Sequence, residues 1–209
     1  NNNGFHIRWF TPKVEVDLCG HATLASAYVI FEILKISESE ILFDSRSGIL
    51  KVFKSDTTIF LDFPTAELKS ISLDTGIFEA LKTEAVISWQ RAKDDFLIEL
   101  PDENTVKNLK PDYQKISQTQ ARGVIVAAPS EDYDFVCRFF APRVGINEDP
   151  VTGSAFTKLI PFWSKKLNKG KLFAKQISER GGEVICQYNG GRVLIGGSAS
   201  VYLRGRIQI

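Results

Sequence analysis

Two short segments place a glycine and polar residues at the predicted start of a helix. They are Cys19-Gly20-His21 and Thr152-Gly153-Ser154. The first turn of a helix leaves about four backbone N–H groups without partners, and the helix dipole adds positive charge there. Each start can therefore bind a carboxylate or enolate oxygen, and a glycine lets the ligand approach the backbone closely. Two such starts facing one cleft would hold a small carboxylate and stabilise an enolate or carbanion as it forms.

These segments supply the predicted substrate-binding residues, which are Cys19, Gly20, Thr152, Gly153 and Ser154. The alternative is simple helix capping, because glycine and small polar residues begin helices in many proteins without a catalytic role. Taken singly, either start is explained by capping, and the occurrence of the pattern twice in the chain makes binding an equal alternative.

Asp149 and His21 are the predicted catalytic residues. Asp149 comes just before the second helix start, and Pro150 after it favours an extended chain. A carboxylate here could receive a proton or orient a protonated partner. His21 lies in the first helical turn, where the dipole predicts a neutral imidazole suited to proton transfer near neutral pH. The neighbouring Glu148 is explained equally well as a solvated acid that stabilises the helix start.

Two further groups are weaker candidates. Cys19 lies beside a helix start, where a thiol can ionise and act as an acid or base, although a small buried residue is the simpler interpretation. Arg180-Gly181-Gly182 could bring a cation close to a ligand carboxylate. A Gly-Gly pair before a strand is usually only a turn.

The helix that begins at His21 is predicted to be surrounded by protein, because apolar residues cover nearly its whole circumference to about Lys35. The apolar run Ala22–Leu34 is shorter than the roughly 20 residues of a membrane span, so a core helix is the better interpretation. A strand is predicted before it at His6–Phe10, ended by Thr11-Pro12, with an extended piece at Val14–Leu18. Alternating runs after it predict strands at Ile41–Phe43, Ile49–Phe53 and Thr58–Phe63.

The same order is predicted again later in the chain. A helix from Gly153 to about Leu167 precedes strands at Leu172–Gln176, Glu183–Tyr188 and Val193–Ile195, with nearly the spacing that follows Gly20. Asn189-Gly190-Gly191 is a hairpin signal. The remaining predicted elements are strands at Ala85–Gln90, Phe96–Leu100, Val124–Ala127 and Phe135–Phe140, and helices at Gly76–Leu81 and Asp102–Leu109.

This repeat predicts an α+β protein of two halves related by duplication, with a cleft between them. Chance recurrence of helix-and-strand units is the alternative. We place the first domain at residues 1–70 and the second at 71–209, with a connector from Thr65 to Thr75. The last strand could pack back on the first domain.

Composition excludes several classes of protein. The 26 Lys and Arg residues balance 25 Asp and Glu residues, which gives a net charge of +1 and no basic run for nucleic acid or membrane lipid. The three widely spaced cysteines fit a reducing compartment, so we expect a cytoplasmic protein. Because the sequence has no phosphate-binding loop, dinucleotide fingerprint or paired Cys or His ligand set, no cofactor or metal is implied.

Three motifs resemble signatures of the PhzF (phenazine biosynthesis) family of isomerase and epimerase-like proteins, which is similar in fold to diaminopimelate epimerase. They are Ile7-Arg8-Trp9-Phe10-Thr11-Pro12, Glu15-Val16-Asp17-Leu18-Cys19-Gly20-His21-Ala22-Thr23, and Arg138-Phe139-Phe140-Ala141-Pro142 through Glu148-Asp149-Pro150-Val151-Thr152-Gly153-Ser154-Ala155. The similarity spans essentially the whole chain. The resemblance implies two pseudo-symmetric domains, each a barrel-like mixed sheet around a central helix, and cofactor-independent proton transfer in the cleft between them. It also implies a homodimer.

The resemblance extends to the site. Five residues match family positions that line or act in the cleft: Gly20, His21, Asp149, Gly153 and Ser154. Cys19 and Thr152 match the positions of the two catalytic cysteines of diaminopimelate epimerase, and the single cysteine kept here argues against a two-thiol racemase mechanism. The family's principal acid/base glutamate lies upstream of the strand with which this sequence begins, and no residue here matches it. We therefore expect the whole protein to be longer.

The predicted function is isomerisation or epimerisation of a small carboxylate-bearing metabolite, by movement of a proton between carbon atoms. The alternative is a non-catalytic small-molecule-binding or interaction protein on the same fold. A third and weaker hypothesis is thiol chemistry at Cys19.

Overall fold

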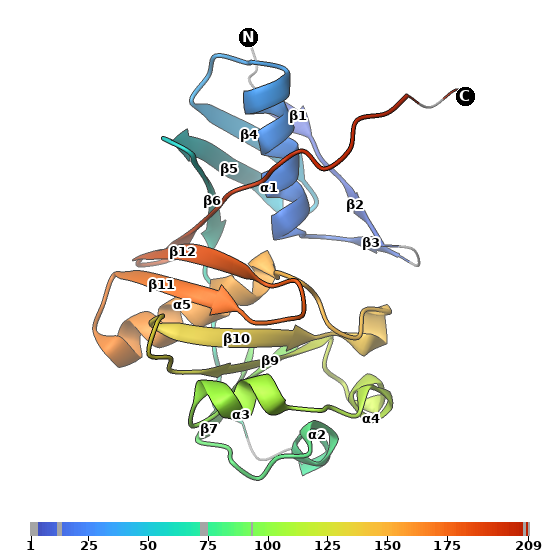
Figure 1. The fold of residues 1–209 in the computed structure, drawn as a ribbon, viewed down its shortest axis with the longest axis vertical. Coiled ribbons are helices and arrows are strands. Elements are labelled where there is room, and N and C mark those ends of the chain that lie inside the picture. The colour runs from blue at the N-terminus through green and yellow to red at the C-terminus, as the bar shows by residue number, and fades with distance from the viewer. Residues whose placement is uncertain (1–3, 12–13, 72–74, 93, 207, 209) are drawn as a thin grey trace.

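The computed structural model describes residues 4–11, 14–71, 75–92, 94–206 and 208. The elements as far as residue 64 are β1 (Gly4–His6), β2 (Trp9–Phe10), β3 (Glu15–Val16), α1 (Gly20–Tyr28), the π-helix η1 (Val29–Ile33), β4 (Glu40–Ser45), β5 (Gly48–Ser55) and β6 (Thr58–Pro64). They are followed by α2 (Thr75–Leu81), β7 (Ser88–Ala92), β8 (Asp95–Glu99), α3 (Glu103–Asn108), α4 (Tyr113–Gln118), β9 (Gly123–Ala128), β10 (Phe135–Phe140), the 3-10 helix η2 (Pro142–Val144), α5 (Gly153–Leu167), β11 (Lys171–Gln176), β12 (Gly182–Asn189) and β13 (Arg192–Gly197). The molecule is elongated, with α1 in its upper part and α5 in its lower part (Figure 1).

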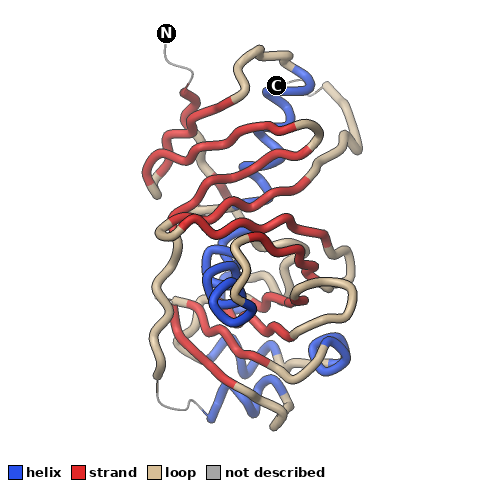
Figure 2. Tube along the Cα trace, turned by 90° about the vertical axis from the view of Figure 1, so that its left-hand side faces the viewer, coloured by secondary structure: helices blue, strands red, loops and turns tan. Residues whose placement is uncertain are grey.

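Within the described residues, one large sheet runs through the molecule (Figure 2). Its eleven strands follow the order β1-β4-β5-β6-β13-β12-β11-β10-β9-β8-β7. Strands β4 to β6 form one antiparallel meander and β11 to β13 form another. The two meanders join where β6 pairs antiparallel with β13. The next strand outward is parallel on each side, β1 beside β4 and β10 beside β11. From β1 to β10 the sheet is therefore symmetric about the β6–β13 pair.

The predicted α+β class is confirmed, as is a helix followed by three strands after both Gly20 and Gly153. The division at residue 70 stays a prediction. Strand β13 hydrogen-bonds directly to β6 along its length, so the two halves share one continuous sheet.

Helix α5 is enclosed by protein on nearly all sides, and its predicted bounds are confirmed. Phe156, Leu159 and Trp163 are fully buried, and the Trp163 ring stacks on Phe135 of β10 with centroids 5.4 Å apart. Burying an apolar side chain of this size stabilises the fold by roughly 1.5–3 kcal/mol. The helix start is therefore held on a rigid core.

Pro161 interrupts the hydrogen bonding inside α5. Proline has no N–H group, so the carbonyl of Thr157, one turn earlier, lacks its helical partner. The backbone N–H of Ala66 donates to this carbonyl at 3.1 Å. The connector that leaves β6 is thus attached to the middle of α5. Residues 72–74 of the predicted connector lie outside the described residues.

Helix α1 begins one residue earlier than predicted and continues as the π-helix η1, whose last turn includes a hydrogen bond from Leu34 N to Val29 O of 2.9 Å. Lys35 then adopts a φ of 54°, which ends the helix. Strands β4 to β6 lie along one side of α1 (Figure 1). Val29, Ile33 and Leu34 remain partly exposed, so within the described ranges this helix is less fully enclosed than its pattern predicts.

A second apolar cluster packs α2, α3 and α4 against β8 and β9. Helix α4 was not predicted, because it is short and follows Pro111. Its first turn is capped by Asp112, whose carboxylate accepts from Lys115 N. Strand β7 begins later than predicted, and the predicted strand His6–Phe10 is divided between β1 and β2. The predicted break at Pro12 lies outside the described residues. In the part of the chain that the structure describes, no helix is both long and apolar enough to cross a membrane.

Candidate functional site

The starts of α1 and α5 meet at Gly20 and Gly153. A Cβ atom added to Gly20 would lie 2.6 Å from the Cα of Gly153, and one added to Gly153 would lie 2.6 Å from the Cα of Gly20. Only glycine permits backbones to approach this closely. The contact is reciprocal, as the two-fold relation between the two meanders requires.

Both helix starts are uncapped in the sense that neither N-cap side chain hydrogen-bonds to its own first turn. Cys19 and Thr152 occupy the N-cap positions in extended conformations, and neither makes a cap hydrogen bond. Neither first turn contains an acidic residue. Cys19 and Thr152 therefore do not act as side-chain caps. The N–H groups of the first turns keep the capacity to bind an oxygen.

His21 links the two helix starts. Its Nδ1 lies 3.0 Å from the carbonyl oxygen of Val151, 130 residues away in the chain, and 4.0 Å from Oδ2 of Asp149. Its Nε2 lies 3.5 Å from Sγ of Cys19. A carbonyl only accepts hydrogen bonds, so Nδ1 carries a hydrogen. The ring is thereby oriented with one nitrogen toward the α5 side and the other toward the thiol.

These contacts raise the pKa of His21 to about 9. The hydrogen bond to Cys19 is the largest cause; burial opposes it, and the charges of Cys19 and Asp149 and the Val151 carbonyl add to it. The predicted neutral imidazole is wrong, because these partners outweigh the helix dipole. The side chain is 52% exposed, so the imidazolium remains accessible to a ligand.

Asp149 is buried beneath the start of α5 with its carboxylate toward His21. The hydroxyl of Thr152 donates to Oδ2 at 2.5 Å, and Asp149 N donates to Phe139 O at 3.1 Å. The carboxylate oxygen therefore has a fixed donor on one side and the imidazolium on the other. All predicted site residues are brought together around this point.

Gln176 of β11 is a site residue that was not predicted. Its side-chain amide accepts from Thr152 N at 2.8 Å and donates to Asp149 O at 2.6 Å. Strand alternation carries a signal for it, because Leu172, Ala174 and Gln176 share the buried face of the strand. A glutamine at an inward-facing position needs polar partners.

Ser154 belongs to a buried ionic network that the sequence pattern did not indicate. Arg122 donates to Ser154 Oγ at 3.4 Å and pairs with Asp95 through two hydrogen bonds. The ammonium of Lys158 lies 2.9 Å from Asp95 and also donates to Ser154 O. Burial lowers the pKa of Lys158, and the charge of Asp95 opposes that shift. Asp95 therefore anchors the first turn of α5 to β8.

Glu148 has a structural role. Its carboxylate accepts two hydrogen bonds from Arg138, at 2.7 and 2.8 Å, and the same guanidinium donates to the carbonyl oxygen of Leu109. The sequence allowed Glu148 to be a solvated acid, but its carboxylate is paired with Arg138. It fixes the loop that carries Asp149.

The Arg180 turn lies next to the site. Ser178 donates to Pro150 O at 2.8 Å, and a Cβ on Gly182 would meet Val151 Cγ2 at 2.6 Å. A cavity of about 490 Å³ beside it is lined by Glu148, Pro150, Ser178, Glu179 and Arg180. The weaker sequence candidate Arg180 therefore borders the segment that carries Asp149.

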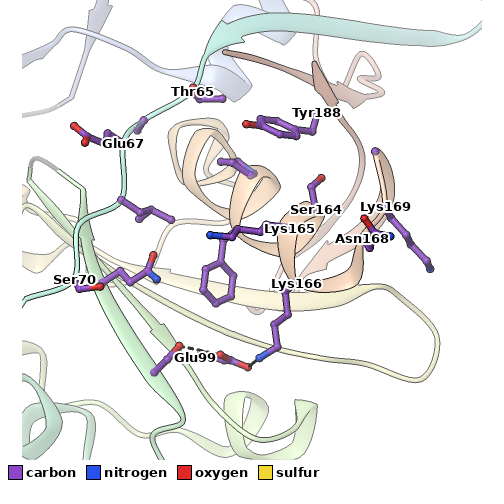
Figure 3. A pocket seen from close by; sticks show the side chains of 17 residues that line it. Thr65, Glu67, Ser70, Glu99, Ser164, Lys165, Lys166, Asn168, Lys169 and Tyr188 are labelled. Atoms are coloured by element: carbon purple, nitrogen blue, oxygen red, sulfur yellow. Dashed lines mark hydrogen bonds and ion pairs between the residues drawn. The ribbon is translucent and has the colours of Figure 1, made fainter. Parts of the chain in front are cut away.

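A larger groove, of about 1240 Å³, lies at the other end of α5 (Figure 3). The connector and the second half of the helix line it, and Lys166 pairs there with Glu99. None of the predicted site residues lines it. The helix thus separates this groove from the site at its start.

The arrangement can bind an anion and transfer a proton. Two uncapped helix starts, the His21 imidazolium and the Asp149 carboxylate lie around one point. Over the described residues, no group of three or more His, Cys, Asp or Glu side chains is placed to hold a metal ion.

The family described as "Phenazine biosynthesis-like protein" (PhzC-PhzF) matches residues 1–205. A Pseudomonas aeruginosa protein named "uncharacterized isomerase" is 42% identical over 206 residues, which cover 98% of this chain and 78% of that protein. The crystal structure of a PhzF family protein of Enterococcus faecalis has a TM-score of 0.94 at 40% identity and covers all of this chain and 80% of its own. A hydroxyproline epimerase of Agrobacterium vitis, at 11% identity and a TM-score of 0.56, covers 94% of this chain and 68% of its own and shares the fold. The chain belongs to the PhzC-PhzF family of phenazine biosynthesis-like proteins, whose relatives include proteins named isomerases.

Proposed function

We propose that this protein is a cofactor-independent isomerase or epimerase that moves a proton on a small carboxylate-bearing metabolite. The observation that carries the proposal is the meeting of two uncapped helix starts at Gly20 and Gly153, with an imidazolium and a carboxylate beside them. Amides at these starts would hold the substrate oxygens and stabilise an enolate as a proton leaves carbon.

In this proposal His21 acts as the proton donor. An imidazolium with a pKa of about 9 holds its proton at neutral pH and can deliver it to an enolate carbon or oxygen. Asp149 acts as the acceptor that orients the ring. The abstracting base is taken from the family resemblance, which assigns that role to a glutamate that no residue of this sequence matches.

The substrate class follows from the same groups. Helix starts and an imidazolium favour a carboxylate, and abstraction of a proton beside it requires a carbon acid such as an amino acid, a hydroxy acid or an unsaturated acid. A homodimer and a cytoplasmic location belong to the same proposal and rest on the family resemblance and the composition.

The test is solvent exchange. The whole protein is incubated in deuterated water with a panel of small carboxylates, and incorporation of deuterium at carbon is measured by mass spectrometry. Deuterium should appear with the wild-type protein and fall strongly with Asp149→Asn and His21→Gln. Asp44→Asn is the matched control, because that carboxylate is exposed on β4 and contacts only His6 among the partners that the structure gives it.

The same panel distinguishes the alternative function. Saturable binding of a carboxylate with no deuterium uptake at any pH would show a binding protein on this fold and would refute the isomerase proposal.

A further inference from the structure

Gln176 is the last residue of β11 and is fully buried. Its strand lies between β10 and β12, where Cys137 and Gly182 are its register partners. Its side chain reaches the segment 149–152, which runs into α5. A buried carboxamide in such a place must satisfy its oxygen and its two N–H groups from protein.

The orientation of this carboxamide is fixed by its two backbone partners. Thr152 N–H can only donate, so the atom 2.8 Å from it is the amide oxygen of Gln176. The carbonyl of Asp149 can only accept, so the atom 2.6 Å from it is Nε2. Reversing the amide would place like groups against each other at both contacts.

The direction of the next hydrogen bonds follows. The second hydrogen on Nε2 points to the hydroxyl oxygen of Thr152, 3.3 Å away. The Thr152 hydroxyl oxygen therefore accepts from Gln176. Among the described residues, the hydrogen of this hydroxyl has Oδ2 of Asp149 as its acceptor, 2.5 Å away. The oxygen of Asp149 that faces His21 is thus an acceptor.

Gln176 also holds the second acceptor of His21. The ring nitrogen Nδ1 contacts the carbonyl of Val151, which lies between the two residues that Gln176 binds. One buried side chain therefore fixes both ends of the segment that supplies Asp149 Oδ2 and the Val151 carbonyl.

We propose that Gln176 is a positioning residue of the site: through Thr152 it holds Oδ2 of the Asp149 carboxylate as an acceptor aimed at His21. This inference rests on the proposed function for its catalytic meaning. It assigns the roles at their contact, because Oδ2 of Asp149 accepts from Thr152 and Nδ1 of His21, which faces the Val151 carbonyl, carries a hydrogen.

The test reads the site without needing a substrate. The chain has two histidines, so the titration of His21 can be followed by NMR with His6 as an internal reference. Thr152→Val removes the hydroxyl with little change of shape, and Thr152→Ser keeps it. We expect the His21 midpoint to fall below about 9 in Thr152→Val and to stay near about 9 in Thr152→Ser.

Gln176→Met tests the same link from its other end, with Gln187→Met on the neighbouring β12 as the matched control. Gln176→Met should lower the His21 midpoint, and Gln187→Met should leave it unchanged. If Gln176→Met does not fold, the Thr152 pair decides the question alone. A His21 midpoint that stays at about 9 in folded Thr152→Val would overturn the inference.

The failure of this inference and the failure of the proposed function are distinguishable. Lack of deuterium uptake by the wild-type protein, together with a lowered His21 midpoint in Thr152→Val, would remove the isomerase proposal and leave the positioning role intact. Wild-type levels of deuterium uptake in both Thr152→Val and Gln176→Met would refute the positioning role of Gln176 but not the isomerase proposal.

Discussion

The two helix starts that meet at the site have similar sequences but different surroundings. The α1 start carries the groups that can change their protonation, the half-exposed His21 and Cys19. The α5 start carries fixed partners, since Asp149 and Thr152 are buried and hydrogen-bonded to Gln176. The two-fold repeat thus provides the same backbone geometry twice, but the side chains differ. The α1 start carries the proton on His21, and the α5 start carries the fixed acceptor Asp149.

The largest expected effect comes from removing the anchor of the α5 start. Asp95 is 2% exposed and is the common partner of Arg122 and Lys158. Asp95→Asn leaves two cations in a poorly solvated place and should lower the free energy of unfolding by about 3 kcal/mol, as for other broken buried ion pairs. Denaturant titration measures this.

The matched control for this change is Asp62→Asn, which breaks a more exposed pair with Arg192 between β6 and β13. Its cost should stay under about 1 kcal/mol, as for surface pairs. Equal losses at Asp95 and Asp62 would contradict the picture of a rigid, buried α5 start.

The next effect comes from the contact of the two starts. Gly20→Ala places a methyl group 2.6 Å from the Cα and 3.2 Å from the N of Gly153, and both are backbone atoms that cannot turn aside. We expect a loss of stability of roughly 1–3 kcal/mol, the usual cost of overpacking. Loss of substrate-dependent deuterium uptake should accompany it in protein that still folds.

Gly170→Ala is the control for this substitution, because no atom lies within 4 Å of a Cβ at that position. It should change neither stability nor exchange by a measurable amount. If Gly20→Ala behaves like Gly170→Ala, the two helix starts do not meet in solution.

A smaller effect is the pH dependence contributed by His21. Its pKa is raised from an ordinary 6.5 to about 9 on folding, so its contribution to stability is fully present below 6.5 and is lost as the pH rises through about 9. Wild-type stability should therefore decline in this window relative to His21→Gln. Denaturant midpoints measured on both proteins across that range test it, and parallel curves would count against the raised pKa.

The smallest effect on the fold concerns the thiols. Cys19 is half-buried beside His21, whereas Cys137 and Cys186 are buried and burial raises the pKa of both. Iodoacetamide should modify Cys19 alone in the native protein and all three thiols in denaturant, as read by peptide mass spectrometry. Labelling of Cys137 or Cys186 in the native protein at a rate similar to that of Cys19 would contradict this difference between the thiols.

Cys19→Ser should also lower the His21 pKa more than Thr152→Val does, because Cys19 is the largest cause of the raised pKa.

Local patterns predict much of this molecule. Helix α5 is predicted at its observed bounds because glycine opens it and apolar residues continue through it, and β11 after it follows from its alternating pattern. The two glycine-led starts and Asp149 were also visible, since each is a feature of a few consecutive residues.

The rest depends on contacts between distant parts of the chain. Gln176 binds Thr152 from 24 residues away, and Arg122 binds Asp95 from 27. The pKa of His21 was wrongly predicted for a different reason: the largest cause of its rise is the hydrogen bond with Cys19, two residues away, and the Asp149 and Val151 partners from the other half add to it. Sequence patterns indicate which residues lie at the site, and the folded structure shows which of their side chains hydrogen-bond to one another.

The proline in α5 has a consequence for motion. Because Pro161 does not donate to the Thr157 carbonyl, Ala66 N–H does, and this hydrogen bond attaches the connector to α5. A movement of one half against the other that keeps this hydrogen bond would have to bend the sheet near the β6–β13 pair. In such a movement, α5 and the connector bound to it would move as one piece.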